Sequence, residues 1–253
     1  MVRCAECELL FVNPRPPAEQ ITEAAKTGLH ASEEGVVLNA RNKLGRGVIK
    51  NEAAKVSRLF ASEIQAGTPL SWLDVGAGFG ELVLAAGAVL PPGSAVRGVE
   101  PMTSKVQAAK AKGANVDSAE LSSITSALDV VSLINVFSHI PDFTGGFGQE
   151  LARLVKPGGV LLIETGNVAE LPTRKDYADK LYLPDHLVFG GRKQISDMVA
   201  KLGFSVEELV EYQTDGLLFS LKAFAHGALR KELVLHWPGT SAFRSIVYKC
   251  RKQ

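Results

Sequence analysis

An excess of charge of either sign is missing from this sequence. Its 253 residues carry 28 Lys and Arg against 27 Asp and Glu, for a net charge of +1. Binding to phosphate backbones needs a basic patch or stripe, which the chain does not show. We therefore expect neither nucleic acid nor an acidic membrane surface as a partner. The basic residues Lys249, Arg251 and Lys252 are too few to change this and predict a solvated terminus.

Cysteine and long apolar runs are also scarce. Three cysteines, two of them in the stretch Cys4–Cys7 (CAEC), cannot form a disulfide framework and fit a reducing compartment. Gly or Pro interrupts the longest apolar stretches before the ~20 residues that a membrane span needs. The opening residues contain acids and lack the apolar block of a secretory leader. We expect a cytoplasmic protein with no membrane partner.

A repeat of strand, turn and helix begins at Pro69, whereas the residues before it are predicted as a loop with helical pieces. The predicted strands are Trp72 to Val75, Ala95 to Glu100, Asn115 to Asp117, Asp129 to Asn135 and Gly159 to Thr165. The predicted helices are near Gly80 to Val89, Met102 to Lys112, Gly146 to Leu154 and Arg192 to Leu202. Nearly continuous apolar strands indicate a parallel sheet covered on both faces, which predicts a doubly wound α/β fold.

Two later segments depart from this repeat. The stretch 166–191 is irregular and rich in aromatics, as insertions that cover a site often are. The stretches 204–213 and 216–225 flank a turn at Thr214 to Gly216 and predict a β-hairpin. A turn is also predicted at Lys156 to Gly159, where Pro and Gly suit the backbone. The parallel sheet is thus expected to end in an antiparallel pair.

The stretch LDVGAGFGE, Leu73 to Glu81, places three glycines directly after the first strand. Ligands of open α/β sheets bind beyond the carboxyl ends of the strands, and glycines let a ligand approach the backbone closely. A dinucleotide motif requires a small residue where this chain has Glu81. The acids Asp74 and Glu100 instead suit a cationic amino acid group and a ribose diol, both of which S-adenosylmethionine carries.

Four segments in order resemble class I S-adenosylmethionine-dependent methyltransferases: LDVGAGFGE, RGVEP, DVVSLINVFSHIPD and LVKPGGVLLIE. The resemblance, which spans about Pro69 to Ala225, implies a Rossmann-like fold with a seven-stranded sheet and S-adenosylmethionine as cofactor. The cofactor-binding residues that follow from the motifs are Asp74, Gly76, Ala77, Gly78, Glu100, Pro101, Met102 and Asn135. The adenine edge is expected to meet the segment Asp117 to Leu121.

The flanks RCAECELLFVNPRP and LPDHLVFGGRKQISDMVAKLGF resemble bacterial methyltransferases that modify sugars or other small metabolites. Several such relatives carry an N-terminal zinc-binding segment with more than one cysteine pair. Here only Cys4 and Cys7 remain in that region, with Cys250 far away in sequence. A structural zinc ion takes about four ligands, so no metal is expected.

Two histidines are the candidate catalytic residues. His139 follows the predicted fourth strand, and His186 lies in the aromatic insertion; either could act as a base for an acceptor hydroxyl. Each could instead brace or pack its loop. Tyr177, Tyr182 and Phe189 could line an acceptor pocket or belong to the core. Arg15, Arg41, Arg46 and Arg58 could face an anionic substrate or solvent.

The sequence therefore predicts methyl transfer to a small molecule. Three segments are expected: an N-terminal helical cap at 1–68, a cofactor-binding domain at 69–225 with a lid at about 166–191, and a tail at 226–253. Two alternatives stay open: a degenerate binding module, favoured by Ser138 where relatives often have an acid, and a nicotinamide-dependent oxidoreductase. The oligomeric state is open, with a homodimer among the alternatives.

Overall fold

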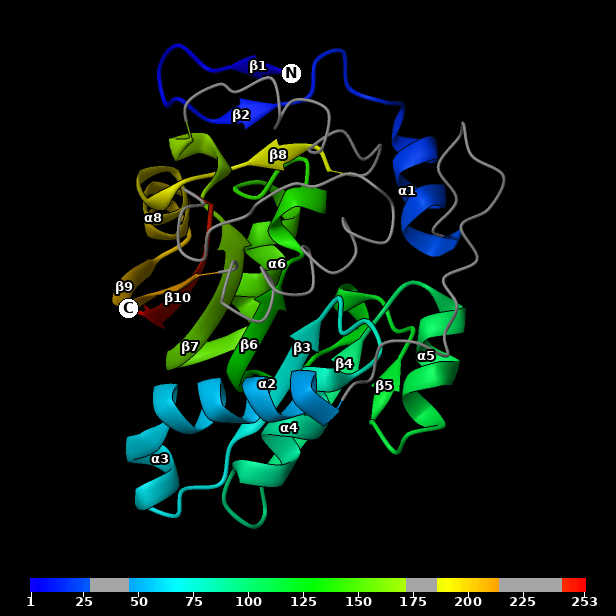
Figure 1. The fold of residues 1–253 in the computed structure, drawn as a ribbon, viewed down its shortest axis with the longest axis vertical. Helices are drawn as coiled ribbons and strands as arrows, with labels where there is room; N and C mark the ends of the chain where they lie inside the picture. Colours follow the sequence, from blue (N-terminus) through cyan, green and yellow to red (C-terminus); the bar gives the residue numbers. More distant parts are fainter. Residues whose placement is uncertain (28–45, 172–185, 214–242) are drawn as a thin grey trace, which may run out of the picture.

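The computed structural model describes residues 1–27, 46–171, 186–213 and 243–253 (Figure 1). Within these ranges the chain folds around a seven-stranded sheet of order β5-β4-β3-β6-β7-β10-β9. Its strands are β3 (Ser71–Val75), β4 (Ala95–Val99), β5 (Val116–Asp117), β6 (Leu128–Ile134), β7 (Val155–Gly166), β9 (Phe204–Gln213) and β10 (Arg244–Lys252). β3 to β7 are paired in parallel, and β10 is antiparallel to both β7 and β9. The predicted doubly wound, mostly parallel sheet with a terminal antiparallel pair is confirmed.

Among the described residues, the strand next to β9 is β10. β9 pairs with β10, whereas the segment 216–225 and its turn lie outside the described residues. The basic residues expected in a solvated tail are part of β10, and Lys249 is buried, with its Nζ donating a hydrogen bond of 2.6 Å to the Leu59 carbonyl. The long aliphatic stem of lysine allows it to occupy a strand while its charged end finds a partner. The last residues of the chain thus complete the sheet.

Helices cover both faces of this sheet. The helix α2 (Arg46–Leu59) and the helix α4 (Glu81–Val89) pack side by side over one face, where Trp72 and Phe60 form the centre of an apolar cluster. The helices α6 (Gly146–Leu154) and α8 (Arg192–Lys201) pack over the other face, in a larger cluster. The remaining helices are α1 (Ala18–Thr27), α3 (Ala61–Gln65) and α5 (Thr103–Lys110). Apolar strands buried on both faces provide the main stabilising contribution of such a fold.

A second, small sheet was not expected from the sequence. The strands β1 (Val2–Arg3), β2 (Leu10–Phe11) and β8 (Val188–Phe189) form it, with β2 in the middle. Figure 1 shows it at the top of the molecule, above the central sheet. The β1–β2 hairpin precedes the helices α1, α2 and α3 in the segment before residue 69. Because β8 contacts the short helix η2 (Phe137–His139) that follows β6, this sheet lies next to the rim of the central sheet.

The segment Lys156 to Gly159, predicted as a turn, is a bulge within β7. Leu128 pairs with Val155 and Val130 pairs with Val160, so the bulge lies opposite Asp129 alone. Lys156 Nζ is 2.8 Å from Asp129 Oδ1, which anchors the bulge to β6. The bulge therefore lies at the amino end of β6, away from the glycine-rich turn.

Candidate functional site

The glycine-rich turn follows β3 with three left-handed glycines. Gly76, Gly78 and Gly80 have φ values of 71°, 54° and 80°, which favour glycine strongly. A Cβ on Gly76 would lie 2.5 Å from Val136 Cγ2, and one on Gly80 would lie 2.5 Å from Ala114 Cβ. A Cβ on Gly78 would meet no described atom within 4 Å. Two of the glycines thus permit close packing, and Gly78 leaves its side of the turn open to a ligand.

Gly80 also explains why the motif tolerates an acid next to it. The close approach that a dinucleotide motif obtains from a later small residue is made here by Gly80, against Ala114. Glu81 begins α4 and is half-buried. A negative charge there favours the helix N-terminus and disfavours a pyrophosphate.

Glu100 lies directly after β4 and is buried. Its Oε2 accepts a hydrogen bond of 2.9 Å from the Gly78 N–H, and its Oε1 accepts one of 3.0 Å from the Met102 N–H. Lys105 Nζ is 3.9 Å from Oε1. A carboxylate has about four acceptor positions, so two remain for a diol. Glu100 therefore links the glycine-rich turn to the end of β4 and keeps acceptor capacity for a ligand.

A cavity of about 190 Å³ opens between these two loops. Of the predicted cofactor residues, it brings together Gly76, Glu100 and Pro101, and it reaches the segment Ser118 to Leu121 that was expected at the adenine edge. The other lining residues are Lys26, Val75, Val99 and Phe147. No sequence pattern pointed to Lys26, which belongs to α1, or to Phe147, which lies at the start of α6. Ala77 and Met102 are buried instead; a Cβ on Gly98 would lie 2.4 Å from Ala77 Cβ.

Asn135 follows β6 in the left-handed region, with φ 58°. Asn tolerates this conformation better than most residues. Its N–H donates a hydrogen bond of 2.8 Å to the Glu164 carbonyl. The turn that it makes places Val136 against Gly76, so Asn135 shapes the far side of the glycine-rich turn.

Asp74 is buried on the face of β3 that α2 and α4 cover. Its Oδ1 accepts a hydrogen bond of 2.7 Å from Ser132 Oγ, which in turn accepts one of 2.8 Å from Trp72 Nε1. Burial raises the pKa of Asp74 to about 7; the Ser132 hydrogen bond opposes this, and the charges of Glu52 and other carboxylates add to it. A single polar residue, Ser132, in an otherwise apolar strand was the sequence feature that could have predicted the contact with Asp74.

A buried ion cluster lies on the same face. Lys55 of α2 forms ion pairs with Glu52, at 2.8 Å, and with Glu164 near the carboxyl end of β7. Glu164 also accepts a hydrogen bond of 2.7 Å from Ser245 Oγ. Burial raises the pKa of Glu52, and Lys55 offsets this only in part. Burial lowers the pKa of Lys55, but the charges of Glu164 and Glu52 outweigh it and raise that pKa overall.

The two candidate catalytic histidines lie in contact. The ring centroids of His139 and His186 are 4.5 Å apart, with an interplanar angle of 70°. The Leu187 N–H donates a hydrogen bond of 2.7 Å to the Ser138 carbonyl, which holds the two segments together. The Phe189 ring is 6.2 Å from His186 and is buried in a small apolar cluster. The structure thus brings together two residues that lie far apart in the sequence.

The remaining predicted residues are dispersed. Arg15 Nη2 donates a hydrogen bond of 3.1 Å to the Pro141 carbonyl, close in sequence to His139. Arg58 faces Glu208 at 3.5 Å, both exposed. Arg41, Tyr177, Tyr182 and the side chain of Arg46 lie outside the described residues. Arg15 therefore contacts the segment that follows His139.

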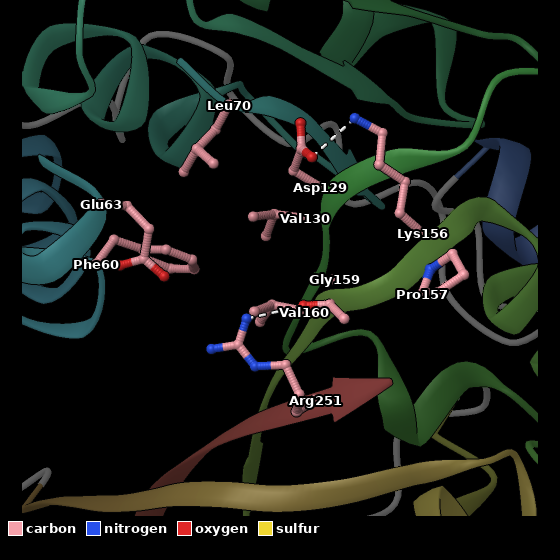
Figure 2. Close-up of a pocket in the computed structure, with 11 residues that line it drawn as sticks. Phe60, Glu63, Leu70, Asp129, Val130, Lys156, Pro157, Gly159, Val160 and Arg251 are labelled. Carbon is pink, nitrogen blue, oxygen red and sulfur yellow. Dashed lines mark hydrogen bonds and ion pairs between the residues drawn. The ribbon is translucent and has the colours of Figure 1, made fainter. Parts of the chain in front are cut away.

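A second cavity, of about 150 Å³, lies at the opposite, amino end of the parallel strands (Figure 2). Figure 2 shows Arg251 and the Lys156–Asp129 ion pair around it. Arg251 Nη1 donates a hydrogen bond of 2.9 Å to the Gly158 carbonyl and its guanidinium pairs with Glu207. Because these charges are already paired and the glycine-rich turn is at the other end, the first cavity is the candidate site.

Among the described residues, no group of three or more His, Cys, Asp or Glu is arranged to hold a metal ion. The absence of a metal centre stays a prediction. In the described part of the chain, no helix is long and apolar enough to cross a membrane.

A family model with the description "Methyltransferase domain" matches residues 46–209, which is more than half of the chain. The chain belongs to this methyltransferase family. No curated protein sequence matches it.

Solved methyltransferase structures share the fold. Magnesium protoporphyrin IX methyltransferase from Synechocystis PCC 6803 with bound S-adenosylmethionine is 17% identical, with 87% of each chain covered and a TM-score of 0.52. The same protein with bound S-adenosylhomocysteine gives a TM-score of 0.54, with 17% identity and coverage of 87% of this chain and 90% of that one. The cyclopropane synthase MmaA2 from Mycobacterium tuberculosis is 14% identical, covers 95% of this chain and 100% of its own, and has a TM-score of 0.61.

The family match distinguishes between the two ligands considered for the glycine-rich turn, S-adenosylmethionine and a dinucleotide. The chain is an S-adenosylmethionine-dependent methyltransferase rather than a dinucleotide-dependent oxidoreductase. Its cavity fits this cofactor: Gly78 leaves the turn open, Glu100 offers acceptors, and Leu121 and Phe147 offer apolar surface. The acids Asp74, Glu81 and Glu100 around the turn also suit a ligand that carries a sulfonium.

Proposed function

We propose that this methyltransferase methylates a hydroxyl group of a small molecule, such as a sugar or a secondary metabolite, next to His139 and His186. The contact between the two imidazoles, at 4.5 Å, is the observation that supports the proposal. The pair follows β6, whereas the cavity for the cofactor lies beyond β3 and β4. An acceptor beside the histidines would therefore lie beside the cofactor rather than on top of it.

The cofactor supplies an electrophilic methyl group when bound. The residues of the chain would bind the cofactor, orient the acceptor and accept its proton. The amino acid and ribose parts of the cofactor would bind at the glycine-rich turn and the end of β4, where Asp74, Gly76, Gly78 and Glu100 lie. Asn135 would shape the boundary toward the acceptor. One imidazole would take the proton of the acceptor hydroxyl, and the other would hold the first in place. The small sheet would exclude water from the rim, which aids alignment of the reacting groups.

Replacement of either histidine tests the proposal. We expect His139→Ala and His186→Ala each to lower kcat about 10²-fold to 10⁴-fold, as is typical when a general base or its support is lost. Because the two rings act as a unit, the double variant should be little worse than the more damaged single variant. The measurement is methyl transfer to a panel of hydroxylated small molecules, with calorimetry of S-adenosylhomocysteine as the control for an intact cofactor site.

Either of two results would count against a histidine base. Full activity of both single variants would exclude the assigned role. Cofactor binding by the parent protein without turnover across a broad acceptor panel would favour the non-catalytic binding module that Ser138 suggested.

Arg15 gives a prediction about the acceptor. Its exposed guanidinium contacts the Pro141 carbonyl and retains donors that suit a carboxylate or phosphate. If the acceptor is anionic, Arg15→Ala should raise KM about tenfold while kcat changes little. Arg58→Ala, at an exposed pair with Glu208, is the matched control. Equal KM values for the parent and both variants would remove Arg15 from the acceptor site.

A further inference from the structure

Cys4 and Cys7 are two thiols that neither the cofactor site nor the proposed acceptor site uses. Both lie in the loop that joins β1 to β2, where Cys4 is half-buried and Cys7 is exposed. The third cysteine, Cys250, lies inside β10 and is 0% exposed. Solvent therefore reaches the pair in the loop, whereas the third thiol is shielded.

The backbone of this loop brings the two thiols together. The Glu8 N–H donates a hydrogen bond of 3.0 Å to the Cys4 carbonyl, which closes a single turn with the hydrogen bond of an α-helix. Cys4 and Cys7 are three positions apart in that turn, and such residues are neighbours, with Cβ atoms roughly 5–6 Å apart. A disulfide needs about 3.5–4.5 Å between these atoms, so a small tightening of an exposed turn is enough to form one.

The turn is anchored at both ends. The Cys4 N–H donates a hydrogen bond of 2.9 Å to the Leu9 carbonyl, which continues the pairing of β1 with β2. At the other end, the Cys7 carbonyl accepts a hydrogen bond of 2.8 Å from Nε2 of Gln194, a buried residue of α8. Glu8 then has a φ of 60°, which reverses the chain toward β2. The backbone therefore holds the two thiols on the same turn.

The two sulfurs have different surroundings. Hydrogen bonds from the backbone N–H of Cys7 and then of Glu6 hold the pKa of the Cys4 thiol below its usual value, and the Cys7 thiol adds to this. Desolvation and the charge of Glu6 oppose the effect. The thiolate is the nucleophilic form of cysteine, so Cys4 is the sulfur of the pair that should react first with an electrophile.

We propose that Cys4 and Cys7 form a reversible disulfide in response to hydrogen peroxide, with Cys4 as the sulfur that is oxidised first and Cys7 as the resolving thiol. The Cys4 thiolate attacks one peroxide oxygen, the O–O bond breaks, and a sulfenic acid forms while hydroxide leaves and takes up a proton. The Cys7 sulfur then attacks the sulfenic sulfur, an S–S bond forms, and the hydroxyl group leaves as water. Two thiols are thus oxidised, one peroxide is reduced to two waters, and a thiol reductant reverses the change.

The position of the pair links it to the rim of the central sheet. The strand β2 follows the turn and pairs with β8, and the Val12 N–H donates a hydrogen bond of 2.9 Å to the Leu187 carbonyl. Leu187 comes directly after His186. Oxidation would therefore modify the small sheet beside the histidine pair. The inference goes beyond the proposed function and does not depend on the acceptor.

Peptide mass spectrometry of the reduced full chain tests the proposal after a small excess of hydrogen peroxide and alkylation of the remaining thiols. We expect the peptide that contains Cys4 and Cys7 to lose two hydrogen atoms and both alkylation sites, and dithiothreitol to restore them. Cys250 should remain reduced and take up the alkylating reagent once the chain is denatured. Burial raises the pKa of Cys250 to about 12 and keeps the peroxide away from it.

Single variants assign the two roles. In Cys7→Ser, we expect Cys4 to be oxidised at close to the parent rate and to stop at the sulfenic acid, which dimedone traps. In Cys4→Ser, consumption of thiol by peroxide should slow at least about fivefold, because the more nucleophilic sulfur is missing. Cys250→Ala is the matched control and should form the disulfide as the parent does.

Four results would count against the pair. Oxidation of Cys250 at the same rate would show that exposure and the turn do not select Cys4 and Cys7. A dimer that only a reductant separates on a denaturing gel would replace the bond within one chain by a bond between two chains. A sulfenic acid that persists in the parent without a disulfide would show that the turn keeps the sulfurs apart. Faster dimedone trapping at Cys7 in Cys4→Ser than at Cys4 in Cys7→Ser would refute the assigned roles.

Discussion

Glu100→Ala is expected to weaken binding of S-adenosylhomocysteine at least 100-fold, a loss of about 2.7 kcal/mol. The carboxylate has two functions that the substitution removes together. It would accept the ribose hydroxyls, and it accepts the N–H groups of Gly78 and Met102, which hold the two walls of the cavity in place. Loss of charge-assisted hydrogen bonds on both the ligand side and the protein side explains the size of the expected effect. Isothermal titration calorimetry measures it directly.

Two further variants separate these functions. Glu100→Gln keeps the shape and an acceptor oxygen but removes the charge, so we expect a smaller loss of affinity. Glu207→Ala removes a carboxylate of β9 that pairs with Arg251 of β10, far from the glycine-rich turn, and should leave binding unchanged. Parent-like affinity of Glu100→Ala would show that the cofactor does not lie against the end of β4.

The parallel part of the sheet could be predicted because its strands are nearly uniform in hydrophobicity. The strands β6 and β7 are buried over most of their length, and their sequences contain the long apolar runs that such burial requires. The glycine-rich turn was predictable for a related reason. Its positive φ values restrict the choice of residue so strongly that the backbone conformation is visible in the sequence.

The strand β10 could not be predicted because some of its charged residues are buried. Lys249 is 6% exposed, yet its sequence neighbourhood resembles a basic tail. Its Nζ reaches the Leu59 carbonyl and the ring of Phe60, at 4.9 Å from the centroid, both on a helix region 190 positions earlier in the chain. The strands β1, β2 and β8 were missed because two-residue strands depend on tertiary pairing rather than on local pattern.

The candidate site was predicted to the extent that local motifs build it. Glu100 and Gly76 belong to such motifs, and both line the cavity. Lys26 also lines it, but it comes from a separate helix with an ordinary polar sequence. The contact of Lys55 with Glu164 spans 109 positions, and no single sequence reveals which distant charges will meet. Residues brought in by tertiary packing are therefore the part of the site that only the structure supplies.

Lys55→Met is expected to lower the free energy of unfolding by about 3 kcal/mol or more at pH 8, because it leaves two buried carboxylates without their cation. The exposed fractions of the Lys55, Glu52 and Glu164 side chains are 14%, 14% and 9%. The methionine side chain has a similar length, so the effect should come from charge rather than from a cavity. Lys50→Met, at an exposed position of the same helix, is the matched control.

The destabilisation should depend on pH in a defined direction. Burial already raises the pKa of Glu52, and removal of Lys55 takes away a charge that lowers it. An acid whose pKa is higher in the folded state binds more protons there, so stability falls as pH rises from its ordinary value toward the raised one. Urea unfolding should therefore show a smaller difference between parent and Lys55→Met at pH 5 than at pH 8.

A triple variant tests whether the two carboxylates are the cause. In Lys55→Met combined with Glu52→Gln and Glu164→Gln, no buried charge of the cluster is left without a partner, and much of the lost stability should return. If the triple variant is as unstable as Lys55→Met alone, packing of the lysine stem rather than its charge stabilises this face of the sheet. Recovery of stability would instead show that the charge of Lys55 stabilises this face of the sheet by neutralising Glu52 and Glu164.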